Sequence, residues 1–420
     1  GGGGAAQALA SLTKPEVDMG VRRHSVQALA ALGIHQAVNP FYQILNESKT
    51  EESALQLWRG VLPMRNAGNV LAERVPGKVT AIAARAGMRA AREGGRDDKK
   101  LVAALTPHSG LTIKPEEMTA ERMLALIDKA DHNGHPGRGE AVYMRQELGC
   151  VLCHSIGGVG GKVGPDMTSI GASAPLDYIV ESLYKPNAKI KEGYHSVVVE
   201  TTSEFEYSGI QVSDSDGVLV LRNAANQLVN IPKNTISKKR NGLSIMPAGL
   251  MEALTEQDTL DLIRFLSALG KPGTYDASQG GAGRVFEVFA GTHRIEQQGA
   301  ERITKGEITK GWKPLMGRVN GMLFGHNLRQ LTQQPKHIGL IHVYLRTGFE
   351  LAEAGEVTFS VAGPLGCALF IDGKKVDGAD NTFTANVSAG KHKVIVRLDA
   401  KDIPRIVRLL CKDVTFATEL

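Results

Sequence analysis

The chain has 420 residues, a net charge of +5 and 42% hydrophobic residues, which is ordinary for a globular protein of more than one domain. No apolar run is long enough to cross a bilayer, and the charge is too small to indicate nucleic-acid binding. The chain opens on Gly1 to Gly4 with no visible signal peptide, so we interpret these glycines as a processed end or a tag remnant.

Residues 5–105 are expected to form one helix after another, because apolar residues recur at three- and four-residue spacing. The expected helices cover residues 5–12, 21–32, 40–45, 53–62, 69–74 and 79–92. Pro40 is expected in the first turn of its helix, with Asn39 as the cap. The stretch 18–29 resembles a HEAT-repeat helix pair, which implies a stacked solenoid over residues 5–117, with a plain helical bundle as the alternative. No catalytic constellation is visible in this region, so we expect a scaffold or docking surface.

Residues 107–115 are expected to link this region to the next, where a helix is predicted at 118–130. His132 and His135 follow in a turn rich in Gly and Pro. No carboxylate accompanies them at a fixed spacing, so we interpret them as solvated side chains rather than metal ligands.

Cys150, Cys153 and His154 form a Cys-x-x-Cys-His sequence, the attachment signature of a c-type haem. On one helical turn, thiols at i and i+3 lie on the same side and can form thioethers to both haem vinyl groups, while the adjacent histidine ligates the iron. Two alternatives are a dithiol redox motif and half of a zinc site. A dithiol redox motif is expected at the start of a helix after a buried strand, and a zinc site needs a second pair of ligands. A helical pattern at 139–148 precedes the cysteines and no second pair is present, so the haem interpretation is favoured.

Two further segments fit around this motif. Pro165 follows a glycine-rich stretch, and its turn offers a carbonyl that can accept the proton of His154 Nδ1. Met246 stands before a proline and a helix expected at 255–269, so its thioether is the expected distal ligand of the iron. The other candidates for that role are Met251 and Met167.

These segments resemble the cytochrome c domain of the Pirellula/Verrucomicrobium haem-binding type, found in dehydrogenase-like proteins of planctomycetes and their relatives. The resemblance covers residues 137–270 and rests on CVLCH, VGPDMTSIG, and SIMPAGL followed by LTEQDTLDLIRFLSALGKP. It implies one covalent haem c in a mainly α cytochrome c fold over residues 118–272. It also implies a periplasmic or other location outside the cytoplasm, a sugar or alcohol dehydrogenase as electron donor, and another cytochrome as acceptor.

Runs of β-branched residues at 196–201, 217–221 and 228–231 predict a small β-insertion at about 194–236. Such an insertion is a feature of the resembled family and is expected to shield one flank of the haem from water. Basic residues bracket it and form either a collar that steers an acidic redox partner or an ordinary solvated face. They are Lys185, Lys189, Lys191, Lys238, Lys239 and Arg240.

Residues 280–420 are expected to form an all-β sandwich. The predicted strands include 357–361, 368–371, 383–387 and 392–398. The block ALFIDGKKV followed by NVSAGKHKVIVRL resembles the β-sandwich named after anthrax protective antigen, which implies a glycan or partner surface, with a purely structural sandwich as the alternative. Cys367 and Cys411 either pair as a disulfide or remain separate buried thiols.

Together these patterns predict a multidomain α + β protein that acts as a monohaem c-type cytochrome, transferring single electrons without bond chemistry of its own. His154 and Met246 are its expected iron ligands. One alternative is a haem enzyme or sensor with an open distal site, for which His195 is the only nearby histidine. Another is a carbohydrate-binding module that carries an accessory haem.

Overall fold

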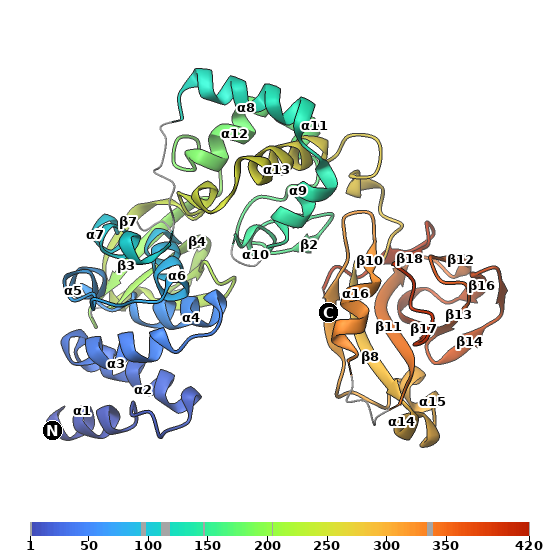
Figure 1. The fold of residues 1–420 in the computed structure, drawn as a ribbon, viewed down its shortest axis with the longest axis horizontal. Coiled ribbons are helices and arrows are strands. Elements are labelled where there is room, and N and C mark those ends of the chain that lie inside the picture. Colours follow the sequence, from blue (N-terminus) through green and yellow to red (C-terminus); the bar gives the residue numbers. More distant parts are fainter. Residues whose placement is uncertain are drawn as a thin grey trace. The chain divides into compact units, whose positions relative to one another are not determined.

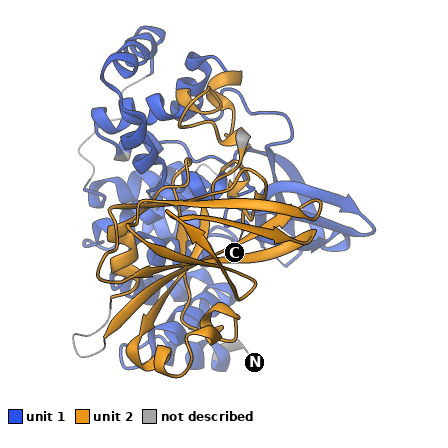
Figure 2. Cartoon of the chain, turned by 90° about the vertical axis from the view of Figure 1, so that its right-hand side faces the viewer, with its two compact units in different colours: residues 1–154, 161–165, 174–266 blue, residues 155–160, 166–173, 267–420 orange. Residues whose placement is uncertain are grey.

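The computed structural model describes residues 2–93, 98–110, 118–145, 148–203, 205–333 and 339–419. Residues 111–115 of the expected linker and 146–147 of the helix expected before the cysteines lie outside these ranges. The chain divides into two compact units (Figure 2). Unit 1 comprises residues 1–154, 161–165 and 174–266, and unit 2 comprises residues 155–160, 166–173 and 267–420.

The coarse prediction of an α + β protein is confirmed, since helices fill the N-terminal part and antiparallel strands the C-terminal part (Figure 1). The first helices are α1 (Gly2–Ser11), α2 (Met19–Leu32), α3 (Ile34–Asn46), α4 (Glu51–Val61), α5 (Ala67–Glu73), α6 (Ala81–Arg92), α7 (Lys99–Leu105) and the 3-10 turn η2 (Thr106–His108). Asp18, Thr50 and Thr80 cap α2, α4 and α6 through their side chains. The apolar faces of these helices share one core around Phe41 and Trp58, both fully buried.

The prediction that Pro40 begins a helix is wrong. Helix α3 begins at Ile34 and runs through Pro40. A proline inside a helix costs about 3 kcal/mol. The apolar face of α3 nevertheless buries Val38 and Phe41 on either side of the proline, together with Ile44 and Leu45 in the next turn. Burial of each large side chain contributes about 1.5–3 kcal/mol, which outweighs the cost of the proline.

The rest of unit 1 carries the cysteines. Its helices are α8 (Ala120–Asn133), α9 (Pro136–Tyr143), α10 (Cys150–Cys153), α12 (Leu176–Tyr184), the 3-10 turn η4 (Leu250–Ala253) and α13 (Glu256–Ala268). The helix expected before the cysteines ends at Tyr143, earlier than predicted. Thr255 and Asp258 cap α13 reciprocally, because Asp258 N–H donates to Thr255 Oγ1 (3.1 Å) and Thr255 N–H donates to Asp258 Oδ2 (3.4 Å).

Unit 1 also contains an antiparallel sheet in the order β6-β5-β4-β3-β7. Its strands are β3 (His195–Thr201), β4 (Glu206–Ser215), β5 (Val218–Arg222), β6 (Leu228–Pro232) and β7 (Ile236–Ser244), with the 3-10 turn η3 (Lys233–Thr235) before the last. The sheet extends beyond the predicted boundary at 236 because β7 pairs with β3. Residues 237–241 of β7 are all exposed, so no alternation of apolar and polar residues marks the strand in the sequence.

Unit 2 is built mainly from two antiparallel sheets. One has the order β10-β18-β12-β16-β15, and the other β14-β13-β17-β11-β8-β9, with β19 paired to β11. The strands are β8 (Val285–Thr292), β9 (Lys313–Met316), β10 (Leu323–Phe324), β11 (Leu340–Leu351), β12 (Gly355–Ala362), β13 (Cys367–Ile371), β14 (Lys374–Val376), β15 (Gly378–Ala379), β16 (Thr382–Val387), β17 (Gly390–Asp399), β18 (Ile406–Leu410) and β19 (Thr415–Phe416). The predicted C-terminal strands fall within β12, β13, β16 and β17. Phe359 and Val407 of one sheet share a core with Leu345 and Val396 of the other.

Short elements complete unit 2. They are the hairpin β1 (Ser155–Ile156) and β2 (Val159–Gly160), the helices α11 (Ile170–Ser173), α14 (His293–Gln297), α15 (Glu301–Thr304) and α16 (Gly325–Leu331), and the 3-10 turn η5 (Ala277–Gln279). Cys367 and Cys411 are separate thiols in this structure, donating to Asn381 Oδ1 (3.3 Å) and Asp413 Oδ2 (3.7 Å) respectively. Among the helices described, none has the length and apolarity needed to cross a membrane.

Candidate functional site

Cys150 and Cys153 begin and end α10, a single turn of helix. Gly149 precedes this turn in the left-handed region, at φ 68°, where a residue with a side chain would be strained. The N–H of His154 donates to Cys150 O at 2.8 Å and closes the turn. The two thiols and the imidazole therefore come from five consecutive residues wound into one turn.

The imidazole of His154 is held in one orientation. Its Nδ1 lies 2.8 Å from Pro165 O, and because a carbonyl only accepts, the proton is on Nδ1 and the lone pair is on Nε2. This is the contact expected for the turn at Pro165. Gly164 lies flat against the ring, where a Cβ would stand 2.5–2.9 Å from Cε1, Nδ1 and Nε2. Gly164 N–H also donates to Cys153 O at 2.7 Å, which ties this loop to α10.

The thiols are poorly suited to dithiol exchange. Burial raises the pKa of the Cys150 thiol to about 12 and that of Cys153 to about 11, although the nearby Arg89 opposes both shifts. A dithiol oxidoreductase needs a thiol whose pKa is lowered. Among the described residues, no group of three or more His, Cys, Asp or Glu side chains is placed to hold a metal ion, so nothing there completes a zinc site.

Helices α9 and α13 cross in close backbone contact just before the cysteines. A Cβ on Gly139 of α9 would stand 1.9 Å from Asp261 O and 2.7 Å from Phe265 Cβ of α13. One turn later, Tyr143 packs on Phe265 with ring centroids 5.6 Å apart. The hydroxyl of Tyr143 then donates to His154 O at 3.1 Å. The crossing thus positions the chain that carries the haem signature.

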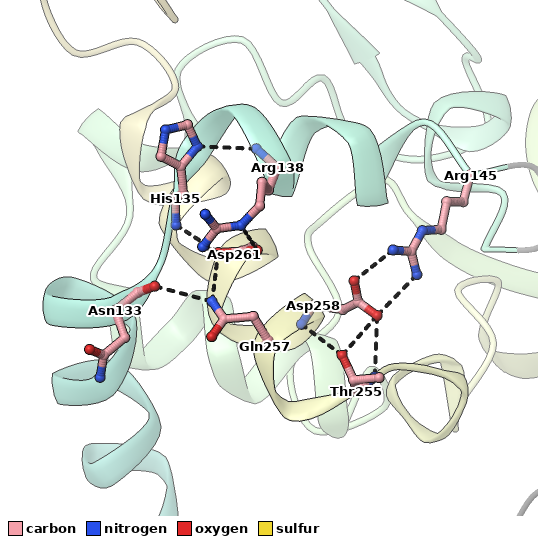
Figure 3. Close-up of polar contacts among 8 residues, drawn as sticks. All are labelled: Asn133, His135, Arg138, Arg145, Thr255, Gln257, Asp258 and Asp261. Atoms are coloured by element: carbon pink, nitrogen blue, oxygen red, sulfur yellow. Dashed lines mark hydrogen bonds and ion pairs between the residues drawn. The ribbon is translucent and has the colours of Figure 1, made fainter.

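A buried carboxylate holds the first half of this crossing (Figure 3). Asp261 is 2% exposed and accepts two hydrogen bonds from Arg138, at 2.7 and 2.8 Å, and one from His135 N–H at 2.7 Å. Gln257 donates to Asp261 Oδ1 and to Asn133 O. Burial by itself would raise the pKa of Asp261, but the hydrogen bonds from Arg138, His135 and Gln257 hold that pKa below its ordinary value. His135 therefore caps the start of α9: its N–H donates to Asp261, and its Nδ1 accepts a hydrogen bond from Arg138 N–H.

A second ion pair holds the end of the crossing. Arg145 donates to both carboxylate oxygens of Asp258, at 3.1 and 2.6 Å, and Thr255 Oγ1 donates to the same carboxylate (Figure 3). The hydrogen bonds from Arg145 are the main reason that the pKa of Asp258 lies below its ordinary value. Bidentate charge-assisted pairs of this kind fix geometry as well as adding stability.

No motif in the sequence indicated that the N-terminal helices contribute to this site. Glu93, at the end of α6, is 7% exposed and bonds Arg59 (2.8 Å) and Arg89 (2.8 Å). The guanidinium of Arg89 lies directly against Gly149, where a Cβ would stand 2.2 Å from Nη2. The charges of Arg59, Arg89 and Glu93 all act on the Cys153 thiol. We call these three residues the Glu93 cluster.

Helix α6 contacts both segments that carry the predicted iron ligands. Arg89 touches Gly149, just before Cys150. Three residues later on the same helix, Arg92 pairs with Glu252 (3.3 Å) and packs so closely on Gly249 that a Cβ there would stand 2.1 Å from Nη1. A cavity of about 530 Å³ is lined by residues of α6, by Leu148 and by residues 247–250. One helix therefore contacts both the chain just before the attachment turn and the segment after Met246, and Leu148 and residues 247–250 line a cavity beside it.

The structure brings Cys150, Cys153, His154 and Pro165 together. Met246 is half-buried in the bend after β7, and its N–H donates to Ser244 Oγ at 3.2 Å. Among the other thioether candidates, Met251 is buried in η4 and Met167 is half-buried. His195, offered for an open distal site, is exposed at the start of β3.

The basic residues around the β-insertion mostly have carboxylate partners. Lys189 pairs with Glu181 (2.8 Å), Lys239 with Asp214 (3.0 Å) and Arg240 with Glu206 (3.2 Å). Lys238 stands 3.9 Å from Glu200. The partner carboxylates cancel much of the local positive charge. These pairs therefore favour an ordinary solvated face over a basic surface that steers an acidic redox partner.

No protein-family model matches the chain, and a search of curated proteins found no match. The residues that sequence reasoning missed are Gly139 at the crossing and the Glu93 cluster. Gly139 and Tyr143 stand four apart on one helix face, a weak signal of close packing. Arg59 and Arg89 carried no signal, since surface arginines are common on amphipathic helices.

Proposed function

We propose that this protein is a monohaem c-type cytochrome that transfers single electrons. The observation that carries the proposal is the turn Cys150–His154, with two thiols on one helical turn and an imidazole whose Nδ1 is tied to Pro165 O. Two thiols and a pre-oriented Nε2 lone pair are what a covalently attached haem requires of its protein.

The residues around the turn fit a haem. Gly164 leaves no side chain over the imidazole, so the ring can stand upright against a flat macrocycle. Cys150 and Cys153 would hold the two thioethers, and His154 Nε2 would be the proximal ligand. When bound, the haem supplies a one-electron couple between ferric and ferrous iron. The hydrogen bond that His154 Nδ1–H donates to Pro165 O raises the basicity of Nε2 and prevents the imidazole from rotating.

We assign the distal position to Met246. Support comes from α6, which contacts both Gly149, just before Cys150, and Gly249, three residues after Met246. A thioether in this position favours the reduced iron and raises the reduction potential. With both axial positions taken by protein, the protein would carry electrons and bind no substrate at iron.

The finer architecture belongs to the same proposal. Residues 118–272 would be a cytochrome c domain with a β-insertion, residues 5–117 a HEAT-like scaffold, and residues 280–420 a sandwich of the protective-antigen type. A sugar or alcohol dehydrogenase, as a module or a partner, would donate the electrons and another cytochrome would accept them. Haem attachment of this kind takes place outside the bacterial cytoplasm, so we place the protein there.

The test is the visible spectrum and intact mass of protein expressed with a haem-attachment system. We expect a mass one haem above that of the polypeptide, a low-spin spectrum, and a far-red ferric band that marks thioether-to-iron bonding. Met246→Ala should keep the haem but make it high-spin and open to cyanide, whereas the matched control Met167→Ala should keep the low-spin spectrum. A colourless protein with the bare polypeptide mass would refute the proposal, and a low-spin Met246→Ala variant would remove Met246 from its role.

A further inference from the structure

A second polar site lies on the outer face of the seven-stranded sheet in unit 2, well away in sequence from the cysteines. Successive residues of β11 point to opposite faces, so Val343 and Leu345 join the shared core while Tyr344 faces outward. There Tyr344 packs in a small apolar cluster with Phe289, Ile303, Phe370 and Ile395. Within this cluster one carboxylate, Glu296 of α14, is 11% exposed.

Glu296 accepts hydrogen bonds from His342 and Tyr344, and we call these three residues, together with the neighbouring Arg397, the Glu296 network. Its carboxylate oxygens both lie 2.8 Å from His342 Nδ1, and Tyr344 OH donates to Oε1 at 3.1 Å. Arg397 of β17 lies directly opposite Tyr344 of β11, and its charge acts to lower the pKa of Tyr344. Burial raises the pKa of Tyr344, so its hydroxyl remains a donor to Glu296.

A glycine makes room for this arrangement. A Cβ on Gly291 of β8 would stand 2.3 Å from Glu296 Oε1 and 2.6 Å from Tyr344 Cε2. Any larger residue would push the carboxylate off the sheet. Glu296 and Tyr344 are therefore built into the fold, and Glu296 holds His342.

Both ends of the network open on one cavity of about 390 Å³. Since Glu296 occupies Nδ1 of His342, Nε2 is the ring nitrogen left for a ligand. Lys375, Asp377 and Asp399 also line the cavity, so its two cations are matched by two carboxylates. Within the described part of the chain, neither Arg397 nor Lys375 lies within ion-pair distance of a carboxylate, so both cations are available to a ligand.

We propose that this cavity binds a small ligand that carries both a carboxylate and hydroxyl groups, of the chemical class of sugar acids. The planar fork of Arg397, which lies over the Phe370 ring, matches a carboxylate through two parallel hydrogen bonds, and Lys375 adds a second positive charge. His342 Nε2, whose ring donates through Nδ1 to Glu296, and the Asp377 carboxylate both accept hydrogen bonds from hydroxyl groups. The volume lies in the range of small-molecule sites. This site is independent of the haem and goes beyond the proposed electron transfer.

The experiment is isothermal titration calorimetry on the full chain, with D-glucuronate as the probe and D-glucose as its neutral counterpart. We expect glucuronate to bind at one site and glucose to bind at least tenfold more weakly, because glucose lacks the carboxylate. Arg397→Gln should weaken glucuronate binding at least tenfold. Arg397→Lys should recover only part of the loss, since it restores the charge without the fork. The control Arg405→Gln removes an equal charge from an exposed position of the same unit and should leave binding unchanged.

Equal affinity for glucose and glucuronate would overturn the assignment, as would the absence of any heat from millimolar glucuronate. Thermal unfolding will show whether Arg397→Gln folds. The comparison of glucuronate with glucose uses the wild-type chain, so it tests the proposal even if that variant does not fold. Repeating the titration on a Cys150→Ala/Cys153→Ala chain separates this site from the haem, because sugar-acid binding should persist there.

Discussion

Gly139→Ala is the substitution that most directly tests the crossing of α9 and α13. The added methyl would stand 1.9 Å from Asp261 O, whereas ordinary contacts begin near 3.4 Å, so the helices must separate by about 1.5 Å (3.4 − 1.9). The obstructing atom is main chain, so no side-chain rotation can relieve the overlap. Separation would also loosen Tyr143 from Phe265 and strain the bonds from Arg138 to Asp261.

Overpacking of this kind costs about 1–3 kcal/mol, and sometimes more. Against this cost, the higher helix propensity of alanine stabilises the helix by about 1 kcal/mol relative to glycine. Because a backbone obstacle places the cost at the upper end, we expect a net loss of about 1–2 kcal/mol at the crossing. That loss corresponds to a roughly 5- to 30-fold change in the local opening equilibrium.

Native-state hydrogen exchange measured by mass spectrometry is the appropriate assay, since a multidomain chain has no single unfolding free energy. Amides of α9 and α13 should lose protection by that factor, while those of α2 should not change. Gly4→Ala is the matched control, because nothing lies within 4 Å of a Cβ there. Unchanged protection of α9 and α13 in Gly139→Ala would refute the close backbone contact.

Three further predictions concern the charges and thiols. In the proposed cytochrome, the Glu93 cluster should shift the midpoint potential of the haem, because positive charge nearby favours reduced iron. In a redox titration, Arg89→Gln should lower the midpoint potential and Glu93→Gln should raise it, each by up to about 59 mV (a tenfold change for one electron). Glu47→Gln, from the separate pair with Arg22, should leave the potential unchanged, and shifts of the same sign in both cluster variants would contradict the cluster's role. The lowered pKa of Asp261 means that its contribution to stability is complete above the unfolded value of about 3.9 and is lost as the pH falls through the folded value. Protection of the α9 and α13 amides against hydrogen exchange should therefore fall more steeply between pH 5 and pH 3 in the wild type than in Asp261→Asn, and parallel curves would be inconsistent with this account. Of the four cysteines, only Cys367 and Cys411 should react in a thiol titration of denatured, haem-loaded protein. Four reactive thiols would mean that no thioethers had formed, and no reactive thiol would mean a disulfide between Cys367 and Cys411.

The sequence was most informative where the interacting atoms are near one another along the chain. The turn Cys150–His154 needs five consecutive residues, and the bond from His154 to Pro165 O spans eleven positions. The helices of the N-terminal part and the C-terminal strands followed from apolar spacing, which reflects a face buried in the same element. Errors arose where burial overrode a local rule, as at Pro40, or where exposed residues completed a sheet, as in β7.

The sequence by itself determined the haem signature, the helical and strand-rich parts, and a proline turn beside the histidine, because all of these depend on local spacing. Only the tertiary structure decided that α6 joins the attachment turn to the segment after Met246, and that Gly139 allows α9 to reach α13. It also decided that Glu296 links His342 to Tyr344. These contacts join residues 46 to more than 150 positions apart, and their specificity comes from atoms that meet only when the chain has packed.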